Sequence, residues 1–315
     1  MQQVATIWSE RGRWWLQLDL KTTGWGPHWR PTSRRLELFA DWIEAQAYVL
    51  ETGLSKSDLV DRLEGTALVK DPDDAWLLVG DAFSACRSRR RQMGSAYPFA
   101  LAGSEIELAD ATKRAYLFCL LASLPEQMKP LRKSYPSAFR DIFEEVVAES
   151  LRRTMPSWTV HETGWSAAAA DGKGNIVQKI VSWTRSKNSD PTVFPYANDA
   201  QIDIAMVRSF SDNRSSFPII LGQCATGATD WKQKASRPNL DRWKSAVQFS
   251  SKPLKMFAVP FALDDDSFWE ATVECAGMVL DRSRICEPLT SLPLPLETKI
   301  NDWLGQVHAV LPWAA

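Results

Sequence analysis

AQIDIAMVRSF at residues 200–210 and FPIILGQCATG at residues 217–227 are two apolar stretches separated by the connection SDNRSS. Short apolar runs bounded by turn-forming residues are typical of buried strands. Asp, Asn and Ser are turn formers, so we predict that the two strands form an antiparallel hairpin. If the hairpin is symmetric about Asn213, position 203 pairs with position 223, because both are equally far from Asn213.

Each of these two strands has a polar residue that interrupts its apolar run on the side away from the turn. Asp203 stands among Ile202, Ile204 and Met206, where an ionised carboxylate is costly unless it is paired or binds a metal. Opposite residues of an antiparallel pair lie on one face, with Cβ atoms about 5 Å apart, so Asp203 and Gln223 can share a metal ion. The alternatives are that Asp203 stands at a strand end or edge, or that a bulge breaks this register.

A third feature is an amphipathic segment at residues 137–153. Glu144 and Glu149 border its apolar stripe, whereas Glu145 points further outward. A carboxylate at the edge of the stripe can reach inward to a site; the alternative is that these acids are solvated helix charges. The stripe recurs at helical spacing and consists of Phe139, Ile142, Phe143, Val146, Val147 and Leu151.

These motifs carry a resemblance to a known superfamily. Phe143-Glu144 on a helix, then a strand with Asp203, then an apolar strand ending in Gln223-Cys224 before a helix, resembles the PD-(D/E)XK (restriction-endonuclease-like) nucleases. The chain is most similar to restriction-endonuclease-like bacterial proteins, several of them tied to phage defence, in which a strand ending GQC leads into a helix beginning with Trp. The resemblance covers residues 137–261, and the order and spacing of the motifs carry it more than any single motif.

The resemblance implies a set of metal ligands. Asp203 takes the place of the acidic metal ligand, Glu144 that of the helical carboxylate, and Gln223 that of the (D/E) residue, while the carbonyl of Cys224 adds a backbone ligand. Gln223 is neutral but keeps an oxygen for a hard cation, Mg²⁺ or Mn²⁺. Such a cation supports phosphodiester hydrolysis by activating water and stabilising charge on the phosphoryl oxygens.

The lysine of the superfamily motif is missing, because Ala225 stands in its place. Either the site is inactive or another lysine serves, and Lys232 and Lys234 follow in a segment that reads as a helix start. The resemblance favours Lys234, three residues after Trp231; the alternative is that both lysines are solvated. Phosphate contacts are expected from basic residues nearby in the sequence, namely Lys187, Arg208 and Arg214.

The rest of the pattern predicts an α/β protein with two domains. Residues 1–130 are expected to form a mainly helical recognition or regulatory domain, with a Trp-rich short hairpin or irregular cap over the first 35 residues and a linker at 125–130. Residues 131–315 are expected to form a restriction-endonuclease-like domain with a mixed central sheet flanked by helices. Expected helices are 36–50, one from about Ser55, 73–93, 112–124, 137–153, 231–250, 266–280 and 297–310; expected strands are 157–164, 176–184, 200–210, 217–225 and 254–263.

Composition excludes several other classes of protein. The net charge of −1 gives no bulk signature of nucleic-acid binding, and 45% hydrophobic residues argue against general disorder. No apolar run is long enough for a membrane span and no signal pattern opens the chain, so a cytoplasmic protein is expected. The five cysteines are too scattered for a disulfide framework and are expected to be reduced core residues. The basic run at residues 87–91 is either a solvated helix face or a contact for nucleic acid or a partner.

The leading hypothesis is a metal-dependent DNA endonuclease that acts in bacterial anti-phage defence, the defence role being implied by the resemblance alone. A second hypothesis is a catalytically silent subunit of nuclease fold that binds nucleic acid or a partner protein. A third is an effector whose N-terminal domain docks a protein partner from the same defence system. The Trp residues of the first 30 positions are candidate contacts for such a partner, or else they cap the helical core.

Overall fold

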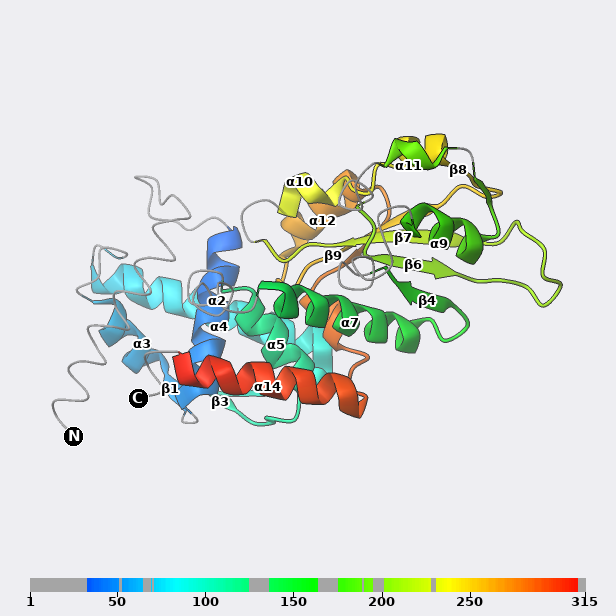
Figure 1. Ribbon diagram of the computed structural model, residues 1–315. Helices are drawn as coiled ribbons and strands as arrows, with labels where there is room; N and C mark the ends of the chain where they lie inside the picture. Colours follow the sequence, from blue (N-terminus) through cyan, green and yellow to red (C-terminus); the bar gives the residue numbers. More distant parts are fainter. Residues whose placement is uncertain are drawn as a thin grey trace. The chain divides into compact units, whose positions relative to one another are not determined.

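A computed structural model describes most of the chain between residues 33 and 310 (Figure 1). The expected Trp-rich cap lies outside the described residues up to position 32, and so does the expected linker at 125–130. The described residues are 33–50, 53–64, 69, 71–124, 136–163, 175–188, 190–194, 201–227 and 231–310.

The chain forms two compact units that are not contiguous in sequence. The first contains Met1–Pro136, Phe261–Ser267 and Thr290–Ala315, and the second contains Ser137–Pro260 and Phe268–Leu289. The first boundary lies close to the expected one, but the last helix, α14 (Leu294–Val310), belongs to the first unit. The physical reason is apolar packing: α14 lies on α5 (Arg114–Ala122), where the rings of Phe118 and Trp303 meet at 5.0 Å.

The first unit combines the expected helices with a small sheet that was not expected. The helices α2 (Ser33–Leu50), α3 (Lys56–Leu63), α4 (Pro72–Met93) and α5 confirm the helical predictions. Ser55 caps α3 in a reciprocal pair of hydrogen bonds with Asp58, and Asp71 caps α4. In the described part, strands β1 (Leu54–Ser55), β3 (Glu105–Leu108) and β2 (Phe99–Ala102) form an antiparallel sheet in that order.

The basic run on α4 does not form a single solvated face. Arg89 is buried, and its guanidinium lies 2.5 Å from Glu37, 2.8 Å from Asp41 and 2.9 Å from Glu44 of α2. Burial raises the pKa of Glu37 although Arg89 opposes that shift. Arg89 therefore ties α4 to α2 instead of meeting an external ligand, whereas Arg90 and Arg91 are exposed.

The second unit contains the predicted mixed sheet, so the chain is of the α/β class. Its strands in the described residues are β4 (Thr159–Glu162), β6 (Ile204–Val207), β7 (Ile219–Cys224), β9 (Leu254–Ala258) and β10 (Met278–Leu280). They lie in the order β10-β9-β7-β6-β4, with antiparallel pairing from β7 to β4 and parallel pairing from β7 to β10. Two short strands, β5 (Lys187–Asn188) and β8 (Val247–Gln248), pair separately.

The register of the β6–β7 hairpin confirms the symmetry predicted from the sequence. Ile204 pairs with Gly222 and Val207 with Ile219, so every pair is centred on position 213. The helices of this unit are α7 (Pro136–Thr154), α9 (Asn175–Thr184), α10 (Trp231–Ala235), α11 (Leu240–Ala246), α12 (Asp265–Cys275) and α13 (Arg282–Cys286).

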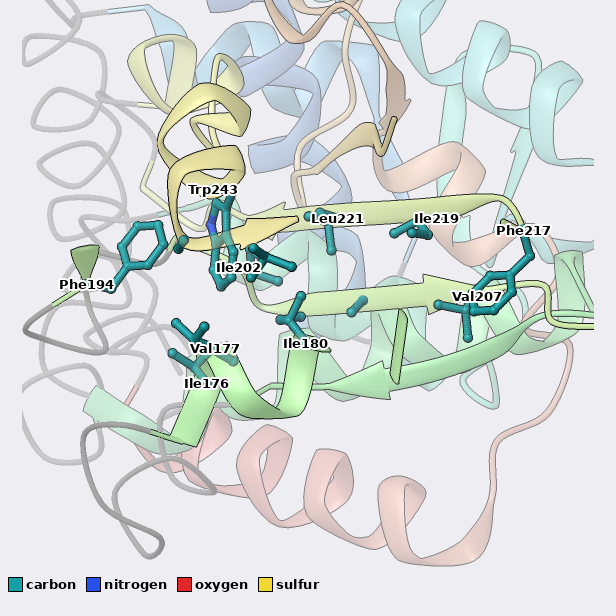
Figure 2. Close-up of a cluster of buried hydrophobic side chains, with 13 residues drawn as sticks. Ile176, Val177, Ile180, Phe194, Ile202, Val207, Phe217, Ile219, Leu221 and Trp243 are labelled. Carbon is teal, nitrogen blue, oxygen red and sulfur yellow. The ribbon is translucent and has the colours of Figure 1, made fainter. Parts of the chain in front are cut away.

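Figure 2 shows the apolar cluster that packs α9 and α11 against this hairpin. Side chains from alternate strand positions, among them Val207, Ile219 and Leu221, meet α9 and the buried ring of Trp243 on α11. The prediction of a strand at 176–184 was wrong: the segment is the helix α9, because Ile176, Val177 and Ile180 recur at helical spacing and enter this cluster together.

Two further segments depart from their predicted structure. The expected helix at 231–250 is divided into α10 and α11 around Pro238, and Asn239 starts α11 by accepting hydrogen bonds from the N–H groups of its first turn. The expected helix at 266–280 ends at Cys275, and residues 278–280 form β10 instead. All five cysteines are free and buried, as predicted.

Candidate functional site

Asp203 lies immediately before β6, at the open end of the hairpin. Its N–H donates to the carbonyl of Gly222 (2.8 Å), and its own carbonyl accepts from the N–H of Thr163, just beyond β4 (2.8 Å). Backbone hydrogen bonds to the neighbouring strands on both sides thus hold Asp203 at the start of β6, near the ends of β4 and β7. Asp203 therefore stands at a strand end, one of the alternatives left open by the sequence, but it is held between strands and only partly exposed.

The side chains of Asp203 and Gln223 meet, as the hairpin symmetry predicts. Oδ2 of Asp203 accepts hydrogen bonds from Nε2 of Gln223 (2.5 Å) and from the N–H of Cys224 (2.7 Å). The same Nε2 donates to the carbonyl of Cys224 (3.3 Å). Oε1 of Gln223 is buried and has no hydrogen-bond partner among the described residues. A buried oxygen without a donor is costly, so this atom is available to a ligand.

Glu144 reaches the same region from α7. Its side chain is buried, deeper than the stripe-edge position predicted from the helix pattern. Burial raises the pKa of Glu144 to about 9, with the negative charge of Asp203 as the next contribution. Burial also raises the pKa of Asp203 to about 6, against the opposing effect of the Cys224 N–H. The charge of Asp203 therefore adds to the effect of burial on Glu144, and in the absence of a cation Glu144 keeps its proton at neutral pH.

Two charged residues at this site were missed by the sequence interpretation. Glu162, at the end of β4, helps to raise the pKa of Glu144, and its Oε1 lies 2.5 Å from Nη2 of Arg152. Arg140, one helical turn before Glu144, lies 4.0 Å from its carboxylate and opposes the pKa shift. Arg140 could have been found from helical spacing alone, because it lies four residues before Glu144. Glu162 could not, because its place at the site depends on the β4–β6 register, which pairs it with Ile204 beside Asp203.

The two candidate lysines on α10 have different surroundings. The positive charge of Lys234, which is half-buried, lowers the pKa of Asp203, so it acts within electrostatic range of that carboxylate. Lys232 is exposed, pairs with Glu270 of α12 and lies 5.8 Å from the ring centre of Trp231. Ala225, at the position of the missing lysine, is buried and donates its N–H to the carbonyl of Ala258.

The three candidate phosphate contacts lie at the other end of the hairpin. Arg208 follows β6, Arg214 belongs to the loop between β6 and β7, and Lys187 on β5 pairs with Gln248 of β8. At about 3.3 Å per strand residue, Arg208 is roughly 17 Å along the strand from Asp203. Figure 1 shows this loop at one end of the β6–β7 pair and α10 at the other. These residues do not join the Asp203 site.

The two carboxylates at this site need further oxygen donors if they are to hold a hard cation. The described residues contain no group of three or more His, Cys, Asp or Glu side chains arranged to hold a metal ion. Asp203 and Glu144 supply two carboxylates, and the remaining donors are the unpartnered Oε1 of Gln223 and the carbonyl of Cys224. Mg²⁺ accepts such a set, because it binds one or two carboxylates and keeps several waters.

No family model, curated protein or solved structure matches the chain. In the part of the chain that the structure describes, no helix has both the length and the apolar character needed to cross a membrane.

Proposed function

We propose that the chain is a metal-dependent phosphodiesterase, a DNA endonuclease of the PD-(D/E)XK (restriction-endonuclease-like) type. The observation that carries the proposal is the pairing of Asp203 with Gln223 next to the buried carboxyl group of Glu144. A helix carboxylate, a strand-end aspartate and a third oxygen donor on the neighbouring strand are the parts that the superfamily resemblance requires. A role in bacterial anti-phage defence is part of the proposal and rests on the resemblance alone.

Each residue has a defined part in this chemistry. Asp203, Glu144, Oε1 of Gln223 and the carbonyl of Cys224 would hold Mg²⁺ or Mn²⁺, which supplies Lewis-acid stabilisation of the phosphoryl oxygens. Glu144 has to lose its proton before it can serve as a ligand, because its pKa is raised in the protein without a cation.

Lys234 is the residue that we assign to charge stabilisation. Its positive charge lowers the pKa of Asp203, so it is close enough to that carboxylate to act on negative charge that develops on a phosphoryl group beside it. Lys232 has a partner of its own in Glu270 and is assigned no part in the reaction.

The experiment is a cleavage assay with purified full-length protein. Plasmid DNA, single-stranded DNA and RNA are incubated with Mg²⁺, with Mn²⁺ or with EDTA. We expect DNA cleavage that needs the cation, and its loss in Asp203→Ala. Because this change removes the acceptor of the Cys224 N–H and of Nε2 of Gln223, circular dichroism checks that the variant is folded. The matched control is Asp302→Ala, which removes an exposed acid of α14 in the first unit. Equal cleavage by the wild type and Asp203→Ala would refute the site.

Ala225 and Gln223 favour a second candidate function, a silent subunit of nuclease fold that binds nucleic acid or a partner protein. Ala225 is buried and offers no charge, and Gln223 lowers the negative charge of the ligand set. In that case the wild-type protein cleaves no substrate with either cation but still binds its partner. The same assay, combined with a binding measurement, separates the two functions.

A protein partner from the same defence system is a further part of the proposal. Trp76 and Leu77, adjacent on α4, expose about half of their side-chain surface at 48% and 53%. Exposed aromatic residues are frequent centres of protein interfaces, which supports a docking role for the first unit. Loss of co-purification of that partner on Trp76→Ala, with the fold unchanged, is the test.

A further inference from the structure

Basic residues from three separate segments meet at the loop of the β6–β7 hairpin. We define the loop surface as Arg185, Lys187, Arg208, Phe210, Arg214 and Lys252. Arg185, just after α9, donates to the carbonyl of Arg214 (3.3 Å) and to Oδ1 of Asn213 (3.1 Å). Lys187 follows two residues later on β5.

The third segment carries Lys252 to the same end of the sheet. Ser250 accepts a hydrogen bond from the N–H of Ser216 (3.0 Å), and the Ser251 hydroxyl donates to the carbonyl of Phe217 (2.5 Å). Lys252, the next residue, leads into β9, whose first residue Leu254 is paired with Ile220 near the start of β7. Segments far apart in the sequence therefore place their positive charges beside one loop.

These charges remain largely open to solvent. Arg214 is 83% exposed although its Nε lies 2.9 Å from Asp212, which is the acid of the 208–216 segment. Lys187, Arg208 and Lys252 are also exposed. Asp241 is the nearby acid that acts on Lys252, but its salt bridge is with Lys244 (2.8 Å). The loop surface therefore keeps a net positive charge.

The loop has contacts that fix its shape before any ligand binds. The guanidinium of Arg185 lies 5.6 Å from the ring centre of Phe217, in addition to its two hydrogen bonds to the loop. Asn213 and Ser216 adopt positive φ values of 58° and 76°, which close the connection tightly. A shape fixed in advance lowers the entropy cost of binding.

The same loop carries an exposed aromatic residue. Phe210 is 59% exposed and lies between Arg208 and Arg214 in the loop. Positive charge that tracks a phosphate backbone, together with an aromatic ring on which a base can stack, is the pattern of single-strand nucleic-acid binding.

We propose that the loop surface binds single-stranded nucleic acid, with its cations on the phosphates and Phe210 stacked on a base. This deepens the proposed function and rests on it for the identity of the polymer. The loop surface lies roughly 17 Å along the strand from Asp203. At about 3.4 Å per nucleotide, the roughly 17 Å from Arg208 to Asp203 corresponds to the length of about five nucleotides.

The test is a binding titration without a cation, so that no cleavage interferes. Fluorescence anisotropy follows a labelled 20-nucleotide strand of DNA between about 50 and 200 mM salt, the range over which phosphate contacts weaken strongly. For a single strand, each lost phosphate contact makes the negative slope of log K against log salt shallower by about 0.7. The double variant Arg208→Ala with Arg214→Ala should therefore show a slope that is shallower by about 1.4. Phe210→Ala should weaken binding roughly tenfold or more.

Three controls keep the outcome specific. Arg91→Ala with Lys299→Ala removes the same charge from exposed residues of α4 and α14 and should leave the titration unchanged. Arg208→Lys with Arg214→Lys keeps the charge and should keep the slope. Asp203→Ala should bind as the wild type does, so a failure of the cleavage site leaves this result intact. Wild-type slope and affinity in the alanine double variant and in Phe210→Ala would overturn the proposal, as would absence of binding by the wild type.

Discussion

The carboxyl groups of Glu144 and Asp203 occupy a place where ionising both is costly. Desolvation is the largest cause of the raised pKa of each, and the charge of Asp203 adds to the shift of Glu144. A cation bound at this site would lower the cost of desolvation, because it would interact with the carboxylates in place of water. It would also lower the repulsion between the two carboxylates by neutralising their charge. The two carboxyl groups are therefore costly to ionise in the protein without a cation, and they are suited to binding one.

The first prediction concerns the pH dependence of stability without a cation. The pKa of Glu144 rises from 4.5 to about 9 and that of Asp203 from 3.8 to about 6, so the folded state binds more protons than the unfolded state between these values. The stability that these two groups contribute to the folded state is fully present below about pH 4. It is lost as the pH rises through about 6 for Asp203 and through about 9 for Glu144. Urea unfolding in EDTA should show the free energy of unfolding falling between pH 5 and 9, by at most about 1.4 kcal/mol per pH unit for each proton.

Two glutamine variants identify the group responsible. Glu144→Gln should flatten the upper part of this slope, because it replaces the group that stays protonated longest. Glu145→Gln, at the half-buried neighbour on the same helix, is the matched control and should leave the slope unchanged. An unchanged slope in Glu144→Gln would show that its carboxyl is not the buried, proton-holding group described above.

The second prediction separates the lysines of α10. Lys234→Ala should lose on the order of a hundredfold or more of metal-dependent cleavage, as when a charge partner of the transition state is removed. Lys232→Ala should cleave as the wild type does, because that lysine is engaged with Glu270. Normal cleavage by both single variants and by the double variant would show that no lysine on this helix replaces the one absent at position 225.

At the residue scale, the sequence predicted the pairs that follow from local geometry. Asp203 and Gln223 were matched because the turn residues centred the hairpin on Asn213, and the observed register has that centre. Glu162 and the burial of Glu144 were beyond reach, since they depend on which strand pairs with β6 and on how α7 packs. Arg89 was misread for the same reason: its carboxylate partners lie on α2, far away in the sequence.

At the level of elements, the short strand β10 can pair with β9 only if the two backbones come close together at Gly277. A Cβ on Gly277 would lie 2.2 Å from the carbonyl oxygen of Lys255, so the residue before β10 has to be glycine for β10 to lie beside β9. This strand was not predicted, because residues 278–280 continue the apolar helical pattern of the preceding segment. Likewise α9 was mistaken for a strand, since a run such as IVQKIV suits a strand by composition and a helix by spacing.

The third prediction follows from that approach. Gly277→Ala should lower the free energy of unfolding by about 1–3 kcal/mol, the usual cost of forcing an extra methyl group into a packed place. Gly80→Ala is the matched control: it lies within α4 with no atom within 4 Å of an added Cβ, and it should raise stability by up to about 1 kcal/mol. Denaturant unfolding of both variants gives the comparison. Gly277→Ala with wild-type stability would contradict the close packing of β10 on β9.

At the scale of the whole molecule, the chain leaves its first unit and returns to it twice. Residues 261–267 and 290–315 belong with the first unit, so neither unit corresponds to a single stretch of sequence. Composition and linker signals gave the boundary near residue 130 but not these returns, because tertiary packing alone places α14 on α5. A fragment beginning near residue 131 would therefore carry α14 without its partner helix.

The central claim is that Asp203, Glu144 and Gln223 hold a cation. The most direct measurement is a Mn²⁺ titration of the full-length protein near neutral pH, followed by calorimetry or by the electron spin resonance of free Mn²⁺. The wild type should bind Mn²⁺ at a site that is lost in Asp203→Ala and weakened in Gln223→Ala, while Asp302→Ala binds as the wild type does. Absence of Mn²⁺ binding by the wild type, or equal binding by Asp203→Ala, would contradict the account.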